Sequence, residues 1–249
     1  VMPFHFEERL ATNVQRILRE ESYLDRVADP GGGSYYIETI TDALAREAWT
    51  LFQQIEASGG FRAYQQSGAL DAAIATARRN KETEMAQRRR TLVGVNAYAD
   101  PSETLPADET DAWRMAGMFE RLRLRTERHR ARTGSVPEVL LLEAGDVKMR
   151  KARSGFCAGF FACAGLPTRA STEPSDTAAL IVLCSSDPEY VELAQRICPQ
   201  TTQPVLVAGN PKEQIEALNA AGVAGFVHLG SNAVETLAAW QDRLGMEKD

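Results

Sequence analysis

Residues 138–165 have the sequence EVLLLEAGDVKMRKARSGFCAGFFACAG, and this stretch decides the fold of the second half of the chain. The apolar run 139–142 predicts a buried strand, and the small and aromatic residues of 156–164 predict a helix. A short loop joins the two, and Asp146 stands where it can cap the helix. A strand that leads through a loop into a helix N-terminus opens a parallel α/β unit, and ligands commonly bind at such a place.

The alternation of strands and helices continues from this stretch to the C-terminus. Continuous apolar runs such as AALIVLC (178–184) are typical of a parallel sheet that is covered on both faces. The expected strands are 139–142, 167–171, 179–184, 204–208 and 225–229, and the expected helices are 148–164, 188–197, 212–221 and 233–244. With right-handed crossovers this order predicts an α/β, flavodoxin-like domain with a doubly wound parallel sheet over 138–249. Only TEPSDTA (172–178) joins the second and third strands, which is too short for a covering helix.

Upstream of this domain the pattern is helical. Leu10, Val14 and Ile17 recur at helical spacing within 6–24, and Thr41 is expected to cap a helix that Gly59 and Gly60 end. Further helices are expected at 61–66 and 70–88, followed by a short strand at 91–95. The basic run 88–90 is interpreted as a solvated last turn of its helix.

An acidic segment with two prolines, ADPSETLPADETD (99–111), is the best linker in the chain, and a charged helix is expected after it at 109–132. We therefore expect three parts: 1–98, a connecting segment 99–137, and the α/β domain 138–249. Because Val1 is not a natural start, we also expect chain before it.

Composition limits the classes of function. A net charge of −6 over 249 residues argues against non-specific nucleic-acid binding, and no apolar run approaches the length of a membrane span. The four cysteines, Cys157, Cys163, Cys184 and Cys198, form no CxxC pair. They are interpreted as buried free thiols of a cytoplasmic protein, with a zinc or catalytic cysteine site as the alternative.

Two regions carry a resemblance to a known family. Residues 6–60 contain Asn13, Gln15, the run EES (20–22), the run DPGGGSY (29–35) and the pair AW (48–49), and VGVNAY follows at 93–98. These motifs resemble the end of the catalytic (β/α)8 barrel of methylmalonyl-CoA mutases. Residues 138–245 are similar to the cobalamin-binding domain of the same family. The resemblance implies that 1–98 is the C-terminal, helical end-segment of a barrel domain together with the helices that follow it.

The resemblance also implies that a ligand site has been lost. In the family, the loop before the first helix of the cobalamin domain carries Asp-x-His-x-x-Gly, and its His binds cobalt. Here these positions are Lys148, Arg150 and Arg153. An arginine keeps its proton and offers no lone pair to a metal. The family's later Gly-Gly pair, which flanks the nucleotide tail, falls on Ala208 and Gly209.

The pattern is similar to the non-catalytic subunits of heterodimeric mutases in this family. It implies that the chain has no catalytic residue, binds no metal and no cofactor, and stabilises a large catalytic subunit that holds adenosylcobalamin. The chain alone is then inactive, while the complex interconverts methylmalonyl-CoA and succinyl-CoA. No nucleic-acid or membrane partner is expected.

Two alternatives stay open. An active cobalamin-binding fragment would need another nitrogen donor, for which His228 is the best candidate. A repurposed flavodoxin-like module would hold another anionic ligand or a chaperone protein. The basic cluster Lys148, Arg150, Lys151 and Arg153 is interpreted either as a solvated helix face or as a contact for an anion or a partner carboxylate.

Overall fold

The computed structural model describes residues 4–105 and 113–246, which form two compact units, Val1–Thr76 and Ala77–Asp249. The first unit is helical. Its helices are α1 (Phe4–Glu20), α2 (Tyr35–Ala57), α3 (Phe61–Gln66) and the first part of α4 (Ala69–Ala86). The predicted stop at Gly59 and Gly60 is confirmed, since both glycines have positive φ between α2 and α3.

Helix α2 begins earlier than predicted. Thr41 lies inside the helix, and Ser34 is the N-cap residue. The N–H of Gly33 donates to Glu38 Oε1 at 3.2 Å, so a side chain from the first turn reaches back over the helix start. Tyr35 to Ile37, which have only moderate helix propensity, are thereby included in the helix.

Apolar side chains of this unit are exposed. Helices α2 and α3 are fully described, and neither has a buried residue. The exposed side chains include Leu10 on α1 and Leu44, Trp49 and Phe52 on α2. Their helical spacing is that of faces which are covered by other elements in folded proteins.

The second unit is built on a five-stranded sheet with the order β2-β1-β3-β4-β5, in which every neighbouring pair is parallel. Its strands are β1 (Val139–Glu143), β2 (Thr168–Ser171), β3 (Leu180–Cys184), β4 (Val205–Ala208) and β5 (Val223–Val227). The register sets Leu141 beside Val182 of β3 and Ala170 of β2. The prediction of a flavodoxin-like parallel sheet is confirmed.

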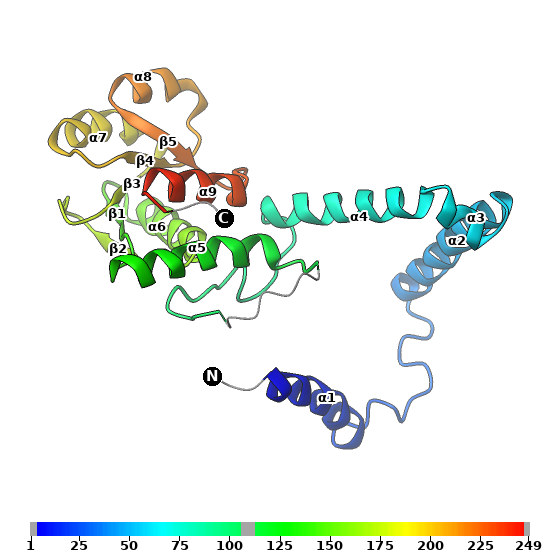
Figure 1. Cartoon of the computed structure of the whole chain (residues 1–249). Helices are drawn as coiled ribbons and strands as arrows, with labels where there is room; N and C mark the ends of the chain where they lie inside the picture. The colour runs from blue at the N-terminus through cyan, green and yellow to red at the C-terminus, as the bar shows by residue number, and fades with distance from the viewer. Residues whose placement is uncertain (1–3, 106–112, 247–249) are drawn as a thin grey trace. The chain divides into compact units, whose positions relative to one another are not determined.

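Helices cover the two faces of the sheet (Figure 1). One face packs against α5 (Gly117–Thr133), α6 (Val147–Ala162) and α9 (Ala233–Arg243). The other packs against α7 (Tyr190–Ile197) and α8 (Ile215–Ala220). The short 3-10 helices are η1 (Asp187–Glu189), η2 (Cys198–Gln200) and η3 (Lys212–Gln214). Strands β1, β3 and β4 are completely buried, as their continuous apolar runs require.

The connection from β2 to β3 contains no helix, and all of its residues, 172–179, are described. Instead the loop places Ala178, which is 3% exposed, against the core that contains Leu140 and Ile181. Edge strand β2 is only half-buried as a result.

Three predictions around α4 and α5 were wrong. Residues 91–95 form no strand; within them Val93 makes only an isolated bridge to Ala97, across a turn that requires positive φ at Gly94. The predicted start of the charged helix at 109 lies outside the described residues, but 113–116 are not helical and α5 begins at Gly117. Helix α4 ends at Ala86, so the basic run 88–90 follows it, and Arg88 is half-buried rather than solvated.

Candidate functional site

The loop from β1 into α6 lies at the carboxyl edge of the sheet, where the loops that follow β3 and β4 also begin. Asp146 caps α6 as predicted, since its Oδ1 accepts from the N–H of Met149 at 2.8 Å. Lys148, Arg150 and Arg153 therefore fall in the first two turns of α6. This cap and the sheet order bring Arg153 to the end of β4.

Arg153 joins three segments of this edge. Its Nη1 donates to the carbonyl oxygen of Ala208 at 2.6 Å, and its Nη2 pairs with Asp187 Oδ1 at 2.7 Å. The guanidinium also lies 5.9 Å from the centre of the Tyr190 ring. A Cβ added at Gly209 would collide with the guanidinium, so Gly209 now makes room for this side chain. The structure thus brings Arg153, Ala208 and Gly209 together.

Tyr190 binds the same end of β4 as Arg153. Its hydroxyl donates to Ala208 O at 2.5 Å and accepts from the N–H of Ser185 at 3.2 Å. Burial raises the pKa of the Tyr190 phenol well above its ordinary value, so the phenol stays protonated and acts as a donor. The carbonyl of Ala208 accepts two hydrogen bonds from side chains of this chain.

Glu189 holds the loop after β3. Its Oε2 accepts from the hydroxyls of Ser185 at 2.5 Å and Ser186 at 2.6 Å, and from the N–H of Ser186 at 3.1 Å. These hydrogen bonds lower the pKa of Glu189 to about 2. Ser186 is the N-cap residue of η1 and forms a capping box with Glu189. The two serines are therefore already engaged within the chain.

The other basic residues of the cluster do not join Arg153. Lys148 is exposed, while Lys151 reaches back to β1 and pairs with Glu143 at 2.7 Å. Burial acts to raise the pKa of Glu143, but Lys151 and the Ser154 hydroxyl outweigh it and hold the pKa below its usual range. Arg150 is half-buried, and its Nε has no hydrogen-bond partner among the described residues.

No metal centre is found in the part of the chain that the structure describes, in which no group of three or more His, Cys, Asp and Glu side chains could hold an ion. His228 Nδ1 accepts from the N–H of Gly230 at 3.1 Å, and burial lowers the pKa of His228. Cys157, Cys163 and Cys184 are buried free thiols, as predicted, and Cys198 is half-buried.

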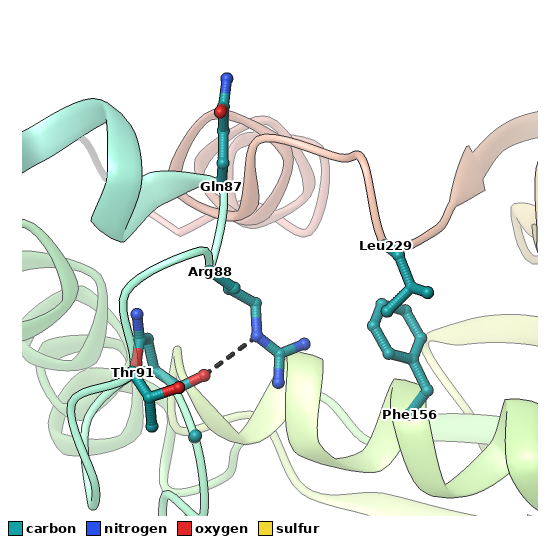
Figure 2. A pocket seen from close by; sticks show the side chains of 7 residues that line it. Gln87, Arg88, Thr91, Phe156 and Leu229 are labelled. Atoms are coloured by element: carbon teal, nitrogen blue, oxygen red, sulfur yellow. Dashed lines mark hydrogen bonds between the residues drawn. The ribbon is translucent and has the colours of Figure 1, made fainter. Parts of the chain in front are cut away.

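One cavity has no counterpart among the predictions from sequence. Arg88 projects into a cavity of about 180 Å3 beside α6 (Figure 2). Its only signal in the sequence is a basic run directly after an amphipathic helix, which is far more often solvated.

Within residues 4–105 and 113–246, no helix is both long enough and apolar enough to cross a membrane.

The chain matches the model of the methylmalonyl-CoA mutase family over residues 1–140. It is 36% identical to the methylmalonyl-CoA mutase small subunit of Porphyromonas gingivalis, over 97% of this chain and 43% of that protein. It is 34% identical to a probable small subunit of Mycobacterium tuberculosis, over 96% of this chain and 41% of the relative. The methylmalonyl-CoA mutase of Escherichia coli is 39% identical over 44% of this chain and 15% of that protein. The chain thus spans about two fifths of the length of the small subunits that it matches.

Proposed function

Because the chain belongs to the methylmalonyl-CoA mutase family, we propose that it is part of a non-catalytic small subunit of such a mutase. In this proposal it accompanies a large catalytic subunit, and the complex interconverts methylmalonyl-CoA and succinyl-CoA. The small-subunit names of relatives that match nearly the whole chain support this assignment. The chain itself supplies no catalytic residue.

One observation carries the proposal: at the carboxyl edge of the sheet, the Arg153 side chain binds Ala208 and Asp187 of the same chain. The family implies adenosylcobalamin, but the residues present do not fit it. Arg150 stands where the family motif has its ligating His, and a guanidinium has no lone pair for cobalt. Arg153 occupies the place beside Gly209 where the motif has a glycine. We infer that the cofactor belongs to the partner subunit.

The alternative of an active cobalamin-binding fragment is disfavoured by His228. Its Nδ1 accepts a hydrogen bond within its own turn, so the neutral ring carries its proton on Nε2 and has no lone pair there for cobalt.

The domain organisation is a further part of the proposal. Residues 1–98 are the helical end of a barrel domain, 99–137 connect it, and 138–249 form a degenerate cobalamin-binding-type domain. The exposed apolar faces of α1 and α2 support this, because they suit packing against further barrel elements. A cytoplasmic location is proposed because buried free thiols persist in a reducing compartment.

Co-expression with the large mutase subunit of the same organism tests the assignment. A stable complex with one copy of each chain is expected in light scattering after size exclusion, with mutase activity in that peak. The large subunit showing full activity and stability alone, with this chain eluting separately, would refute it.

A further inference from the structure

The Arg88 cavity lies in the second unit, between the segment after α4 and helix α6, with the loop after β5 at its rim (Figure 2). Its lining residues are Gln87, Arg88, Thr91, Asn96, Ala97, Phe156 and Leu229. None of the five positions aligned with the family's cofactor motifs is among them. The cavity is therefore separate from the place where Arg153 contacts Ala208 and Asp187.

Arg88 is held in place by the protein but is not neutralised by it. Its φ of 56° lies in the left-handed region, which directs the side chain inward from the end of α4. Its Nε donates to the carbonyl oxygen of Asn96 at 3.0 Å, and its guanidinium lies over the rings of Phe156 at 5.3 Å and Phe160 at 5.9 Å.

The guanidinium keeps an unused donor. Its Nη1 is buried without a hydrogen-bond partner, and among the described residues no carboxylate forms an ion pair with Arg88. A buried charge that lacks a counter-ion is costly, so an anion at this place would stabilise it.

The remaining lining residues define what that anion can be. The Asn96 side chain is engaged elsewhere. Its amide nitrogen donates to Arg90 O at 2.8 Å and Met85 O at 3.2 Å. Its amide oxygen accepts from the Leu92 N–H at 2.8 Å. Figure 2 shows Gln87 pointing away from the guanidinium, and Thr91 on the loop beside it. The walls formed by Ala97 and Phe156 are apolar, and Leu229 at the rim is 83% exposed.

We propose that the Arg88 cavity binds a carboxylate group carried on a short apolar stem. One guanidinium donor and one hydroxyl suit the two oxygens of a carboxylate, whereas a phosphate dianion demands more donors. A volume of about 180 Å3 is too small for a nucleotide or a cofactor. The carboxylate comes either from a free short-chain acid or from an Asp or Glu side chain of a partner chain.

The first experiment is a titration of the full chain with sodium butyrate at constant ionic strength, followed by the NMR signals of the Arg88 Nε–H and the Ala97 amide. Saturable shifts are expected, and 1-butanol, with the same stem and no charge, gives none. Arg88→Gln is expected to abolish the shift of the Ala97 amide. Leu229→Glu supplies a competing carboxylate at the rim and is expected to weaken butyrate binding about tenfold. Leu229 is exposed, so this substitution does not endanger folding. Arg89→Gln, at the exposed neighbour of Arg88, is the matched control and retains binding.

The second experiment distinguishes the source of the carboxylate, and it rests on the proposed function. Affinity for the large subunit is measured for the unchanged chain and the same three variants. If a partner side chain fills the cavity, Arg88→Gln and Leu229→Glu weaken association by about tenfold or more, and Arg89→Gln does not. Butyrate binding with unchanged association assigns the site to a free acid. If butyrate does not bind and all variants associate equally, the carboxylate site is refuted while the small-subunit assignment stands.

Discussion

At the scale of single residues, Arg153 matters because its guanidinium joins the end of β4 to η1. Arg153→Ala removes a charge-assisted hydrogen bond to Ala208 and a half-exposed ion pair. We expect a loss of about 1–2 kcal/mol in the free energy of unfolding, measured by urea denaturation at pH 7. Lys148→Ala, on the same helix but exposed, is the control and changes stability by less than about 0.5 kcal/mol. Equal denaturation midpoints for both variants would show that the contacts of Arg153 do not stabilise the fold.

Glu189 makes the same edge sensitive to acid. Its pKa is lowered from 4.5 in the unfolded chain to about 2 in the folded protein, so its contribution to stability is complete above pH 4.5. As the pH falls from 4.5 to 2, the unfolded state takes up the proton first and this contribution is lost.

Glu189→Gln should therefore be less stable than the unchanged protein at pH 7, and the difference should shrink below pH 4.5. Urea denaturation at pH 7, 4 and 3 measures this. Glu192→Gln, at an exposed position of α7, is the matched control. A stability difference for Glu189→Gln that stays constant from pH 7 to pH 3 would contradict the assignment.

At the scale of elements, α5 and α9 are fastened to each other by polar contacts. Arg125, 8% exposed, pairs with Asp242 at 2.6 Å and donates to Met246 O at 3.0 Å, and Gln241 donates to Leu122 O at 2.7 Å. We expect Arg125→Ala to cost about 2–3 kcal/mol in the free energy of unfolding, because buried acceptors lose their donor. Arg121→Ala, on the exposed side of α5, should leave the denaturation midpoint unchanged. An unchanged midpoint for Arg125→Ala as well would mean that the contact is dispensable.

The sheet and its helices were predictable from sequence, and the reason is physical. Strands such as β1 and β3 are buried on both faces, so they must be continuously apolar, and this pattern can be read directly from the sequence. The start of α2 was misplaced because Glu38 bonds back to Gly33, a local contact that has no apolar period to reveal it.

The candidate site was predictable only as a set of positions. Strand ends meet at one edge of a parallel sheet, which brings Arg153 near Ala208 and Gly209. Which atoms pair was not foreseeable, because Asp187 and Tyr190 belong to another loop. Arg88 was missed because its inward direction depends on a single backbone angle after the helix has ended.

At the scale of the whole molecule, the two units differ in how much they bury. Helices α2 and α3 have no buried residue, whereas β1, β3 and β4 are completely buried. In proteins most of the stability of a helix comes from tertiary packing of its apolar face, so helices that lack this packing are marginal in water. In the chain alone, the backbone amides of α2 and α3 should exchange hydrogen orders of magnitude faster than those of β1 and β3. If the large subunit covers the apolar faces of α2 and α3, its addition should slow the exchange of the amides in these two helices. Equal exchange rates in both units of the chain alone would contradict this difference.

We propose that this chain fills the family's cofactor site with its own side chains and leaves the cobalamin to a partner. The most direct test is equilibrium dialysis of the full chain against adenosylcobalamin, with bound cofactor read by its visible absorbance. Cofactor should remain equally distributed across the membrane, because Arg150 offers no ligand and Arg153 occupies the space beside Gly209. Retention of one cobalamin per chain would contradict the account.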